Sequence, residues 1–258
     1  MAVARWRYVV PNAFTAASLV FAVLAIEAAV AGRAIAAAWW GLYGLLTDRL
    51  DGAAAKALGA QSDFGVQFDS LADLAIFGLV PPTVIYTYFE RRPALGWSSP
   101  AARVALVVMC IGFTISAAVR LGRFNVTAAH GGARHYTGTP STMTAGIVGA
   151  AFLTCLKYSA PALRQPEDLD HWRWLGGLEL DGAVPWTPLL LAAGAIAMLS
   201  PLRVPRLGRT KRRVTDVILA AAVASGYVAG LFHRLPEYLL GGGAYYLLVC
   251  FAYHLRTR

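Results

Sequence analysis

Four aspartates between residues 48 and 73 are the side chains of this sequence best suited to chemistry, because they interrupt strongly apolar segments. Asp48 and Asp51 are three residues apart, and Asp69 and Asp73 are four residues apart, so each pair shares one face of a helix. A charged side chain at the centre of a bilayer costs about 2.5–3.5 kcal/mol, and four unpaired carboxylates would cost on the order of 10 kcal/mol. Four such groups in one place therefore require a compensating positive charge.

The connection between the two aspartate pairs is short, from about Gly59 to Asp63, which predicts two antiparallel helices with both pairs at similar depth. Divalent cations between the facing carboxylates would supply the missing charge. Oxygen ligands suit Mg²⁺, Mn²⁺ or Ca²⁺ better than zinc, and no histidine or cysteine lies nearby in the sequence. Gly52 and Gly65 leave space beside the acids in which a phosphate group fits.

Each aspartate taken alone also has an ordinary structural interpretation, since Arg49 and Lys56 are available as partners. Four aspartates with two glycines at these intervals favour a metal site instead. Asp63 stands apart from the four, and together with Ser62 we interpret it as a helix cap. Glu27 is a further acid within an apolar stretch, and it has no evident partner in the sequence.

The composition of the whole chain places these acids in a membrane protein. Of the 258 residues, 57% are hydrophobic and only 14% are charged, and the mean hydropathy is +0.54. Soluble domains average roughly 45–50% apolar and about 25% charged residues. So few charges exclude both a soluble globular domain of this size and a disordered chain. The expected fold class is an all-α, polytopic membrane helix bundle.

Eight stretches are apolar and, at about 20 residues, long enough to cross a bilayer as helices. We expect the first to be a retained helix rather than a cleaved signal segment, and residues 1–258 to form a single membrane domain. Eight spans place both termini on one side of the membrane. The expected spans are residues 10–31, 34–58, 64–89, 101–121, 141–159, 185–202, 214–232 and 236–254.

Basic residues predict the orientation of these spans. The net charge is +9, and the densest basic cluster, residues 203–213, lies in a connection on the same side as both termini and the aspartates. Because basic residues gather on the cytoplasmic side, the termini and the acidic site are expected to face the cytoplasm at the cell membrane. We interpret the positive charge as anchoring to membrane lipids and expect no nucleic-acid binding. The three cysteines lie far apart in apolar runs and form no metal motif.

The aspartates belong to a long motif without gaps. It reads Asp48-x2-Asp51-Gly52-x2-Ala55-Lys56-x8-Gly65-x3-Asp69-x3-Asp73. This pattern resembles the signature of the CDP-alcohol phosphatidyltransferase family in every spacing and in all fixed residue types but one. The exception is Lys56, where the family usually has arginine. Lysine keeps the charge but lacks the planar, bidentate guanidinium group.

Further segments resemble the serine-using branch of this family, the integral-membrane phosphatidylserine synthases. The resemblance covers slightly more than the amino-terminal half of the chain. Ile76 departs from it, since that branch often has serine there, and Thr139 replaces an apolar residue. The matching segments are Pro11 to Thr15, Ser62 to Gly65, Phe68 to Asp73, Arg120 to Val126 and Gly138 to Ser141.

The resemblance implies an enzyme that transfers a phosphatidyl group from CDP-diacylglycerol to the hydroxyl group of serine and releases CMP. It implies two divalent cations, Mg²⁺ or Mn²⁺ with Ca²⁺ as an alternative, held by the four aspartates, and a homodimer. Asp73 would also be the base that takes the proton of the alcohol. The nucleotide and its phosphates are expected to bind along Gly52, Ala55, Lys56 and Gly65.

The acceptor alcohol is expected to bind near the end of the fourth span. Arg120 and Arg123 are candidates for binding the carboxylate of serine, although both also fit as positive anchors on the cytoplasmic side. Asn125 is a further candidate, as are Thr139 and Ser141 at the start of the fifth span. As alternatives, Asn125 and Ser141 also fit as helix or turn caps.

Two alternatives are open from the sequence. The same reaction could use another acceptor, such as glycerol 3-phosphate or an inositol phosphate, in which case extra basic residues would bind the phosphate of that acceptor. The alternative outside enzymes is a cation transporter. A transporter predicts acids spread along a path over several helices, whereas these acids lie on two helices at one end.

Overall fold

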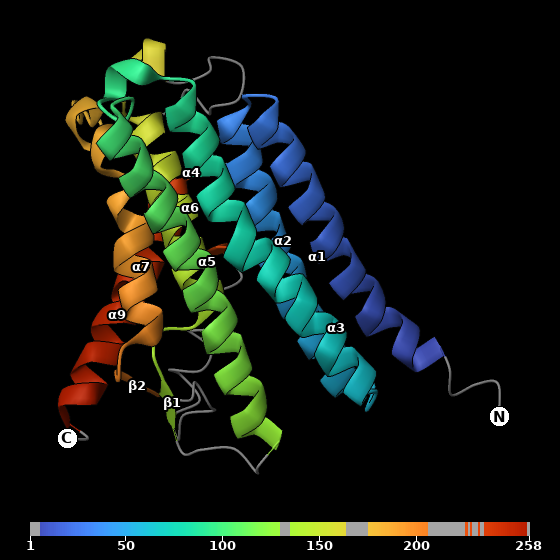
Figure 1. Ribbon diagram of the computed structural model, residues 1–258. Coiled ribbons are helices and arrows are strands. Elements are labelled where there is room, and N and C mark those ends of the chain that lie inside the picture. Colours follow the sequence, from blue (N-terminus) through green and yellow to red (C-terminus); the bar gives the residue numbers. More distant parts are fainter. Residues whose placement is uncertain are drawn as a thin grey trace.

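The computed structural model of the protein describes residues 6–129, 135–163, 175–205, 225–226, 228, 232 and 235–256. Nearly all of this part of the chain is helical (Figure 1). The α-helices are α1 (Trp6–Val30), α2 (Ala34–Ala57), α3 (Asp63–Asp73), α4 (Val80–Glu90), α5 (Pro100–Ala129), α6 (Ser141–Lys157), α7 (Leu189–Leu199) and α9 (Pro236–Arg256). Shorter elements are the π-helical turn η2 (Leu74–Leu79), the 3₁₀ turns η3 (Pro93–Leu95), η4 (Pro161–Leu163) and η5 (Asp181–Trp186), and the strands β1 (His135–Thr137) and β2 (Arg203–Pro205).

Four helical segments in the described part of the chain are long and apolar enough to cross a membrane, and the protein is accordingly a membrane protein. These segments are Arg7–Val30, Asp63–Glu90, Pro100–Thr127 and Pro236–Leu255. α2 fills the second expected span but carries charged residues in its last turns, and α6 and α7 are shorter. The expected span 214–232 lies almost entirely outside the described residues, as do residues 206–213 of the basic cluster.

The helices form a bundle with α1, α2 and α3 on one side and α7 and α9 on the other (Figure 1). α1 packs along α2, α5 packs along α7, and α6 contacts both α2 and α9. α1 begins and α9 ends at the end of the bundle where α2 turns into α3. We call this the acidic end, because Asp48, Asp51, Asp69 and Asp73 lie on these two helices.

The segment from α3 to α4 is one continuous rod with a change of helix type in the middle. After Asp73 the chain forms the π-helical turn η2, and the first turn of α4 contains Pro81 and Pro82. Proline has no backbone N–H, and its ring collides with the carbonyl group four residues earlier in an α-helix. The wider π-helical turn accommodates these two prolines without breaking the rod.

The hydrophobic core lies where α2, η2, α4 and α6 meet. Its largest buried side chains include Phe77 of η2, Tyr88 of α4 and Phe152 of α6, and Tyr88 packs edge-on against Phe152. The close approach of α2 and η2 depends on Gly44, where an added methyl group would lie 2.3 Å from Ile76. The core thereby fixes α2 against the rod that carries the second aspartate pair.

The expected all-α fold is confirmed for the described residues, apart from one short ribbon of β1 and β2. The two strands pair antiparallel, with Tyr136 opposite Val204. Gly138 follows β1 with φ of +77°, and a side chain there would collide with the backbone carbonyl of Met198. The ribbon therefore joins the chain before α6 to the chain after α7.

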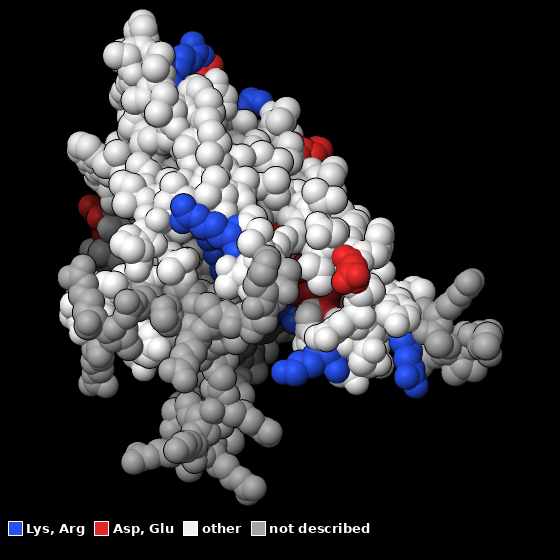
Figure 2. Space-filling view, turned by 60° about the horizontal axis from the view of Figure 1, so that its bottom comes forward, with Lys and Arg blue, Asp and Glu red and all other residues white. Residues whose placement is uncertain are grey.

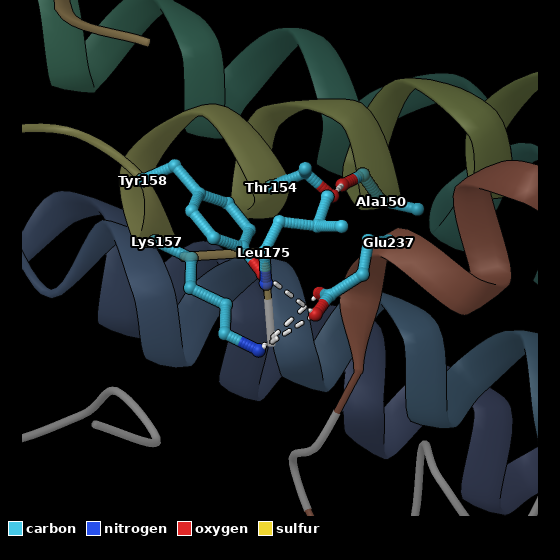
Figure 3. Close-up of polar contacts among 6 residues, drawn as sticks. All are labelled: Ala150, Thr154, Lys157, Tyr158, Leu175 and Glu237. Carbon is cyan, nitrogen blue, oxygen red and sulfur yellow. Dashed lines mark hydrogen bonds and ion pairs between the residues drawn. The ribbon is translucent and has the colours of Figure 1, made fainter. Parts of the chain in front are cut away.

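Ion pairs lie at the end opposite the aspartates. Glu27, for which sequence analysis found no partner, forms an ion pair with Arg33. Lys157 of α6 is fully buried, and its ammonium group lies 3.0 Å from the carboxylate of Glu237 of α9 (Figure 3). Tyr158 donates a hydrogen bond to the same carboxylate. This cluster ties the start of α9 to the end of α6.

Candidate metal and substrate site

The two aspartate pairs come together although they lie on different helices. One carboxylate oxygen each from Asp48, Asp51 and Asp69 lies within 4.8 Å of the other two. The side chain of Asp73 contacts that of Asp48, and Asp51 is buried while the other three are partly buried. Because like charges this close repel strongly where water is scarce, the ionised cluster needs cations to be stable.

The available ligands suit a hard divalent cation. All of them are carboxylate oxygens, which Mg²⁺, Mn²⁺ and Ca²⁺ prefer. The separation of up to 4.8 Å between the three oxygens is close to what one ion can span with bonds of about 2.1–2.4 Å. The cluster could therefore hold a metal ion after only small movements of its carboxylates.

Basic side chains flank the acids without pairing to them. Figure 2 shows this end of the molecule, where acidic side chains are partly recessed and basic side chains lie around them. The charge of Arg49 acts on Asp48, but the guanidinium group of Arg49 contacts the Sδ atom of Met143 at 3.3 Å. Among the described residues no ion pair involves any of the four aspartates. Ordinary pairing with Arg49 or Lys56 therefore does not account for the cluster.

α1 contributes a side chain to the acidic cluster to which sequence analysis assigned no role. The hydroxyl group of Thr15 donates a hydrogen bond of 2.7 Å to Oδ2 of Asp51, and both residues are buried. The only signal in the sequence is the place of Thr15 in the segment from Pro11, which resembles the serine-using branch. Nothing in the spacing along α1 indicates which acid, 36 residues away, the hydroxyl group meets.

Two hydrogen bonds fix the position of α3, which carries the second aspartate pair. Ser62 is the cap, since its hydroxyl group accepts a 3.0 Å hydrogen bond from the backbone N–H of Gly65, and Asp63 is the first helical residue. Ser70, between the two aspartates of α3, accepts a 2.8 Å hydrogen bond from the amide group of Asn125 of α5. The amide of Asn125, expected near the acceptor, is thus bonded to α3.

The residues expected to bind the nucleotide lie at the ends of α2 and α3 that connect to one another. A side chain added at Gly52 would have no neighbouring atom within 4 Å, so the space beside this part of α2 is open. A side chain added at Gly65 would lie 3.1 Å from the Ser62 hydroxyl group. Ala55 is partly buried and Lys56 is exposed. Open space beside the acids is what a diphosphate group would require.

Of the residues expected to bind the acceptor, the structure brings Arg120 and Ser141 together. The guanidinium group of Arg120 donates a 3.1 Å hydrogen bond to Oγ of Ser141, which is fully buried as the first residue of α6. Ser141 does not cap its helix, because α6 has no side-chain cap. Thr139 is buried with its hydroxyl group 2.9 Å from that of Thr144, and Arg123 is exposed.

The last described helix, α9, also reaches the acceptor side. Tyr246 interacts electrostatically with Arg120 and Arg49, which belong to α5 and α2. Nothing in the sequence marks Tyr246 as functional, because a tyrosine in an apolar span is most simply a packing residue. Arg120 consequently has neighbours on α6 and α9 that lie far from it in the sequence.

Four helical segments long and apolar enough to cross a membrane, together with three carboxylates within reach of one ion, define an integral-membrane protein with a candidate divalent-cation site. The sequence model of the CDP-alcohol phosphatidyltransferase family matches residues 8–193. Because this match covers more than half of the chain, the protein belongs to the CDP-alcohol phosphatidyltransferase family. The matched region includes all four aspartates and leaves α9 outside.

Several relatives carry one activity in their names. The CDP-diacylglycerol–serine O-phosphatidyltransferase of Helicobacter pylori (strain J99) is 32% identical over 151 residues, which is 58% of this chain and 60% of the relative. The protein of the same name from Mycobacterium tuberculosis (strain H37Rv) is 28% identical over 227 residues, or 85% of this chain and 72% of the relative. That from Bacillus subtilis (strain 168) is 25% identical over 183 residues, or 64% and 98%. The chain thus matches less than two thirds of the Helicobacter protein.

Proposed function

We propose that this protein transfers a phosphatidyl group from CDP-diacylglycerol to the hydroxyl group of serine, forming phosphatidylserine and releasing CMP. The observation that carries the proposal is the gathering of one carboxylate oxygen each from Asp48, Asp51 and Asp69 within 4.8 Å of one another, with open space beside Gly52 on the same helix as the first two. The names of the relatives add support for serine as the acceptor.

Two divalent cations, Mg²⁺ or Mn²⁺ with Ca²⁺ as an alternative, would be held by Asp48, Asp51, Asp69 and Asp73. The oxygen-only ligand set fits these ions. When bound, such ions neutralise charge on a diphosphate and at the phosphorus under attack. The open space beside Gly52 gives the diphosphate room to approach the carboxylates, and Ala55, Lys56 and Gly65 would border the nucleotide.

Asp73 is the base in this proposal. It contacts Asp48 but does not belong to the group of three closest oxygens, so its carboxylate is the one best placed to turn toward the acceptor. It would take the proton of the serine hydroxyl group while the serine oxygen forms a bond to the phosphatidyl phosphorus. The bond from that phosphorus to the CMP oxygen breaks, and CMP leaves with the electron pair.

Arg120 is the residue that we assign to the carboxylate of serine. It is held by Ser141 and has Tyr246 nearby, so its guanidinium group is ordered by neighbours from two other helices. Asn125 and Thr139 already use their polar groups within the protein. We therefore assign them a structural role and no direct contact with the acceptor.

The proposed setting is the cell membrane, with eight spans in one domain of residues 1–258. The acidic end and both termini would face the cytoplasm. Serine, which is water-soluble, would reach the site from there, and CMP would leave to the same side. The acyl chains of the lipid substrate would lie among membrane lipids at the side of the bundle. A homodimer completes the proposal, and no nucleic-acid partner is expected.

The deciding experiment incubates the purified full chain with CDP-diacylglycerol and a panel of labelled alcohols, namely serine, glycerol 3-phosphate and an inositol phosphate. We expect labelled phosphatidylserine and an equal amount of CMP. A lipid product from another alcohol would keep the reaction and change the acceptor. CMP release from none of them would refute the proposal.

Chelation tests the metal part separately. We expect a strong chelator to stop CMP release and an excess of Mg²⁺ or Mn²⁺ to restore it, because the carboxylates alone repel the diphosphate. Turnover that continues after complete chelation would contradict the metal site while leaving the acceptor assignment standing.

A further inference from the structure

We propose that Thr15 is a positioning residue that fixes Asp51 in the orientation needed for holding a cation. Thr15 lies on α1, which carries none of the four aspartates, yet its hydroxyl group donates a 2.7 Å hydrogen bond to Oδ2 of Asp51. This inference rests on the proposed function in one respect, namely that the acidic cluster binds a divalent cation.

The hydrogen bond between Thr15 and Asp51 lies in the interior of the protein. Thr15 is 3% exposed and Asp51 is 6% exposed, so neither group can exchange its partner for bulk water. Thr15 also lies 3.3 Å from the backbone carbonyl of Pro11, a contact that threonine commonly makes within a helix. The hydroxyl group has one proton, and the shorter distance and the negative charge of the carboxylate favour donation to Asp51.

Neighbouring polar contacts hold α1 in register with α2. One turn along α1 from Thr15, the hydroxyl groups of Ser18 and Thr47 lie 2.8 Å apart. Ser18 also donates a 3.3 Å hydrogen bond to the backbone carbonyl of Gly44, and it is buried. These contacts prevent α1 from sliding along α2, so the Thr15 hydroxyl group stays opposite Asp51.

A carboxylate has acceptor sites for several partners, so the hydrogen bond from Thr15 to Oδ2 does not exhaust the capacity of Asp51 to bind an ion. Partners of this kind orient metal ligands, and their removal typically lowers metal affinity about 10–100-fold. Thr15 would thus act on the cation through Asp51, without touching the cation or the substrates.

The test measures Mn²⁺ binding by electron paramagnetic resonance in the purified, detergent-solubilised full chain. Thr15→Val keeps the shape of the side chain and removes the hydroxyl group, and we expect its Mn²⁺ affinity to fall about 10–100-fold. Thr15→Ser keeps the hydroxyl group and is expected to bind Mn²⁺ as the unaltered protein does. Turnover of Thr15→Val should recover in excess Mn²⁺.

Thr154→Val is the matched control. Thr154 is equally buried on α6, and its hydroxyl group donates to the backbone carbonyl of Ala150 four residues earlier (Figure 3). The Thr154→Val variant therefore loses only a hydrogen bond to a backbone carbonyl four residues earlier, as Thr15 also makes to Pro11. Its Mn²⁺ affinity should not change. Thermal melting of each variant reports folding, and Thr15→Ala carries the same expectation if Thr15→Val does not fold.

Unchanged Mn²⁺ affinity in a folded Thr15→Val or Thr15→Ala variant would overturn the inference and leave the proposed function intact. Equal losses in Thr15→Val and Thr154→Val would also overturn it, since the effect would then be general to buried threonines. If the unaltered protein binds no Mn²⁺, the metal site of the proposed function fails and this inference fails with it.

Discussion

At the scale of single residues, Asp73 differs from the other three aspartates in its surroundings. One carboxylate oxygen each of Asp48, Asp51 and Asp69 lies within 4.8 Å of the other two, whereas Asp73 lies outside this group of three, with its side chain against that of Asp48. We expect a carboxylate outside the group of three to be more available to an incoming hydroxyl group than one inside it. We therefore expect substitutions within the same cluster to differ: some lose turnover alone, and others lose both turnover and cation binding.

We predict that Asp73→Asn lowers CMP release by about 10²–10⁴-fold, the usual contribution of a general base, while Mn²⁺ binding persists. Asp69→Asn should lose both CMP release and Mn²⁺ binding, since it removes one of the three central ligands. Both variants are compared by Mn²⁺ titration and by a CMP-release assay. Turnover retained by Asp73→Asn would remove the base assignment.

Arg120 and Arg123 offer a second comparison between neighbouring residues. Arg120 is held by Ser141, whereas Arg123 is exposed. Loss of a hydrogen bond to a charged group costs about 1.5–3 kcal/mol, so Arg120→Ala should raise the KM for serine about 10–100-fold with little change in the KM for CDP-diacylglycerol. Arg123→Ala should have the smaller effect on the KM for serine. The reverse order would move the acceptor site away from α6.

The site was predictable from the sequence where its residues are close in the chain. The intervals from Asp48 to Asp73 sufficed to place the two pairs on antiparallel helices. Thr15 and Ser141 lie far along the chain from Asp51 and Arg120, and the spacing within one helix does not tell which face meets another helix. Asn125 shows the same limit, because a polar side chain suited to a ligand is equally suited to a hydroxyl group on a neighbouring helix.

At the scale of the elements, two of the glycines of α2, Gly44 and Gly52, have opposite requirements. Gly44 lies against the core, where an added methyl group would overlap Ile76, while Gly52 faces open space. The first glycine serves packing, and the second leaves room near the acids. One helix thus separates a structural role from a functional one within two turns.

We predict that Gly44→Ala destabilises the protein by about 1–3 kcal/mol, the usual cost of overpacking, and that adding Ile76→Ala restores part of the loss. Gly52→Ala should melt like the unaltered protein and raise the KM for CDP-diacylglycerol roughly tenfold or more, since small misplacements of a substrate are costly. Thermal melting in detergent and steady-state kinetics check both. Equal melting of Gly44→Ala and Gly52→Ala would contradict the packing argument.

Hydropathy predicted most helices of the bundle within a few residues, because long apolar runs have few other folds available in a membrane. It did not predict the π-helical turn between Asp73 and Pro81. That turn depends on how the prolines fit the backbone, and a hydropathy average is insensitive to one extra residue per turn. It likewise could not predict the ribbon of β1 and β2, which is three residues long on each side.

At the scale of the whole molecule, α9 is attached to the bundle at its start and at its middle. Lys157 and Tyr158 bind Glu237 at its start, and Tyr246 at its middle interacts electrostatically with Arg120 of α5. Between them, Gly243 allows α9 to approach Ile147 of α6, since an added methyl group would lie 2.4 Å from that side chain. A helix outside the matched family region is therefore integral to the bundle.

We predict that Lys157→Met or Glu237→Gln alone destabilises the protein by about 3–5 kcal/mol. Each substitution leaves the remaining charged side chain in the interior without its partner of opposite charge. The double variant Lys157→Met with Glu237→Gln should lose less than the sum of the two single losses. Denaturant unfolding in mixed micelles gives the three values. Strictly additive losses would show that the two side chains do not stabilise one another in the folded protein.

The buried pair also orders events during synthesis. Lys157 precedes Glu237 by 80 residues, and at a translation rate of roughly 5–20 residues per second its anion emerges several seconds later. Until then we expect the ammonium group to stay near water at the membrane surface, because burying an unpaired charge is costly, and α6 to reach its final depth only afterwards. The pairing of Glu237 on α9 with Lys157 would thus be the step that allows α6, made earlier, to complete its insertion.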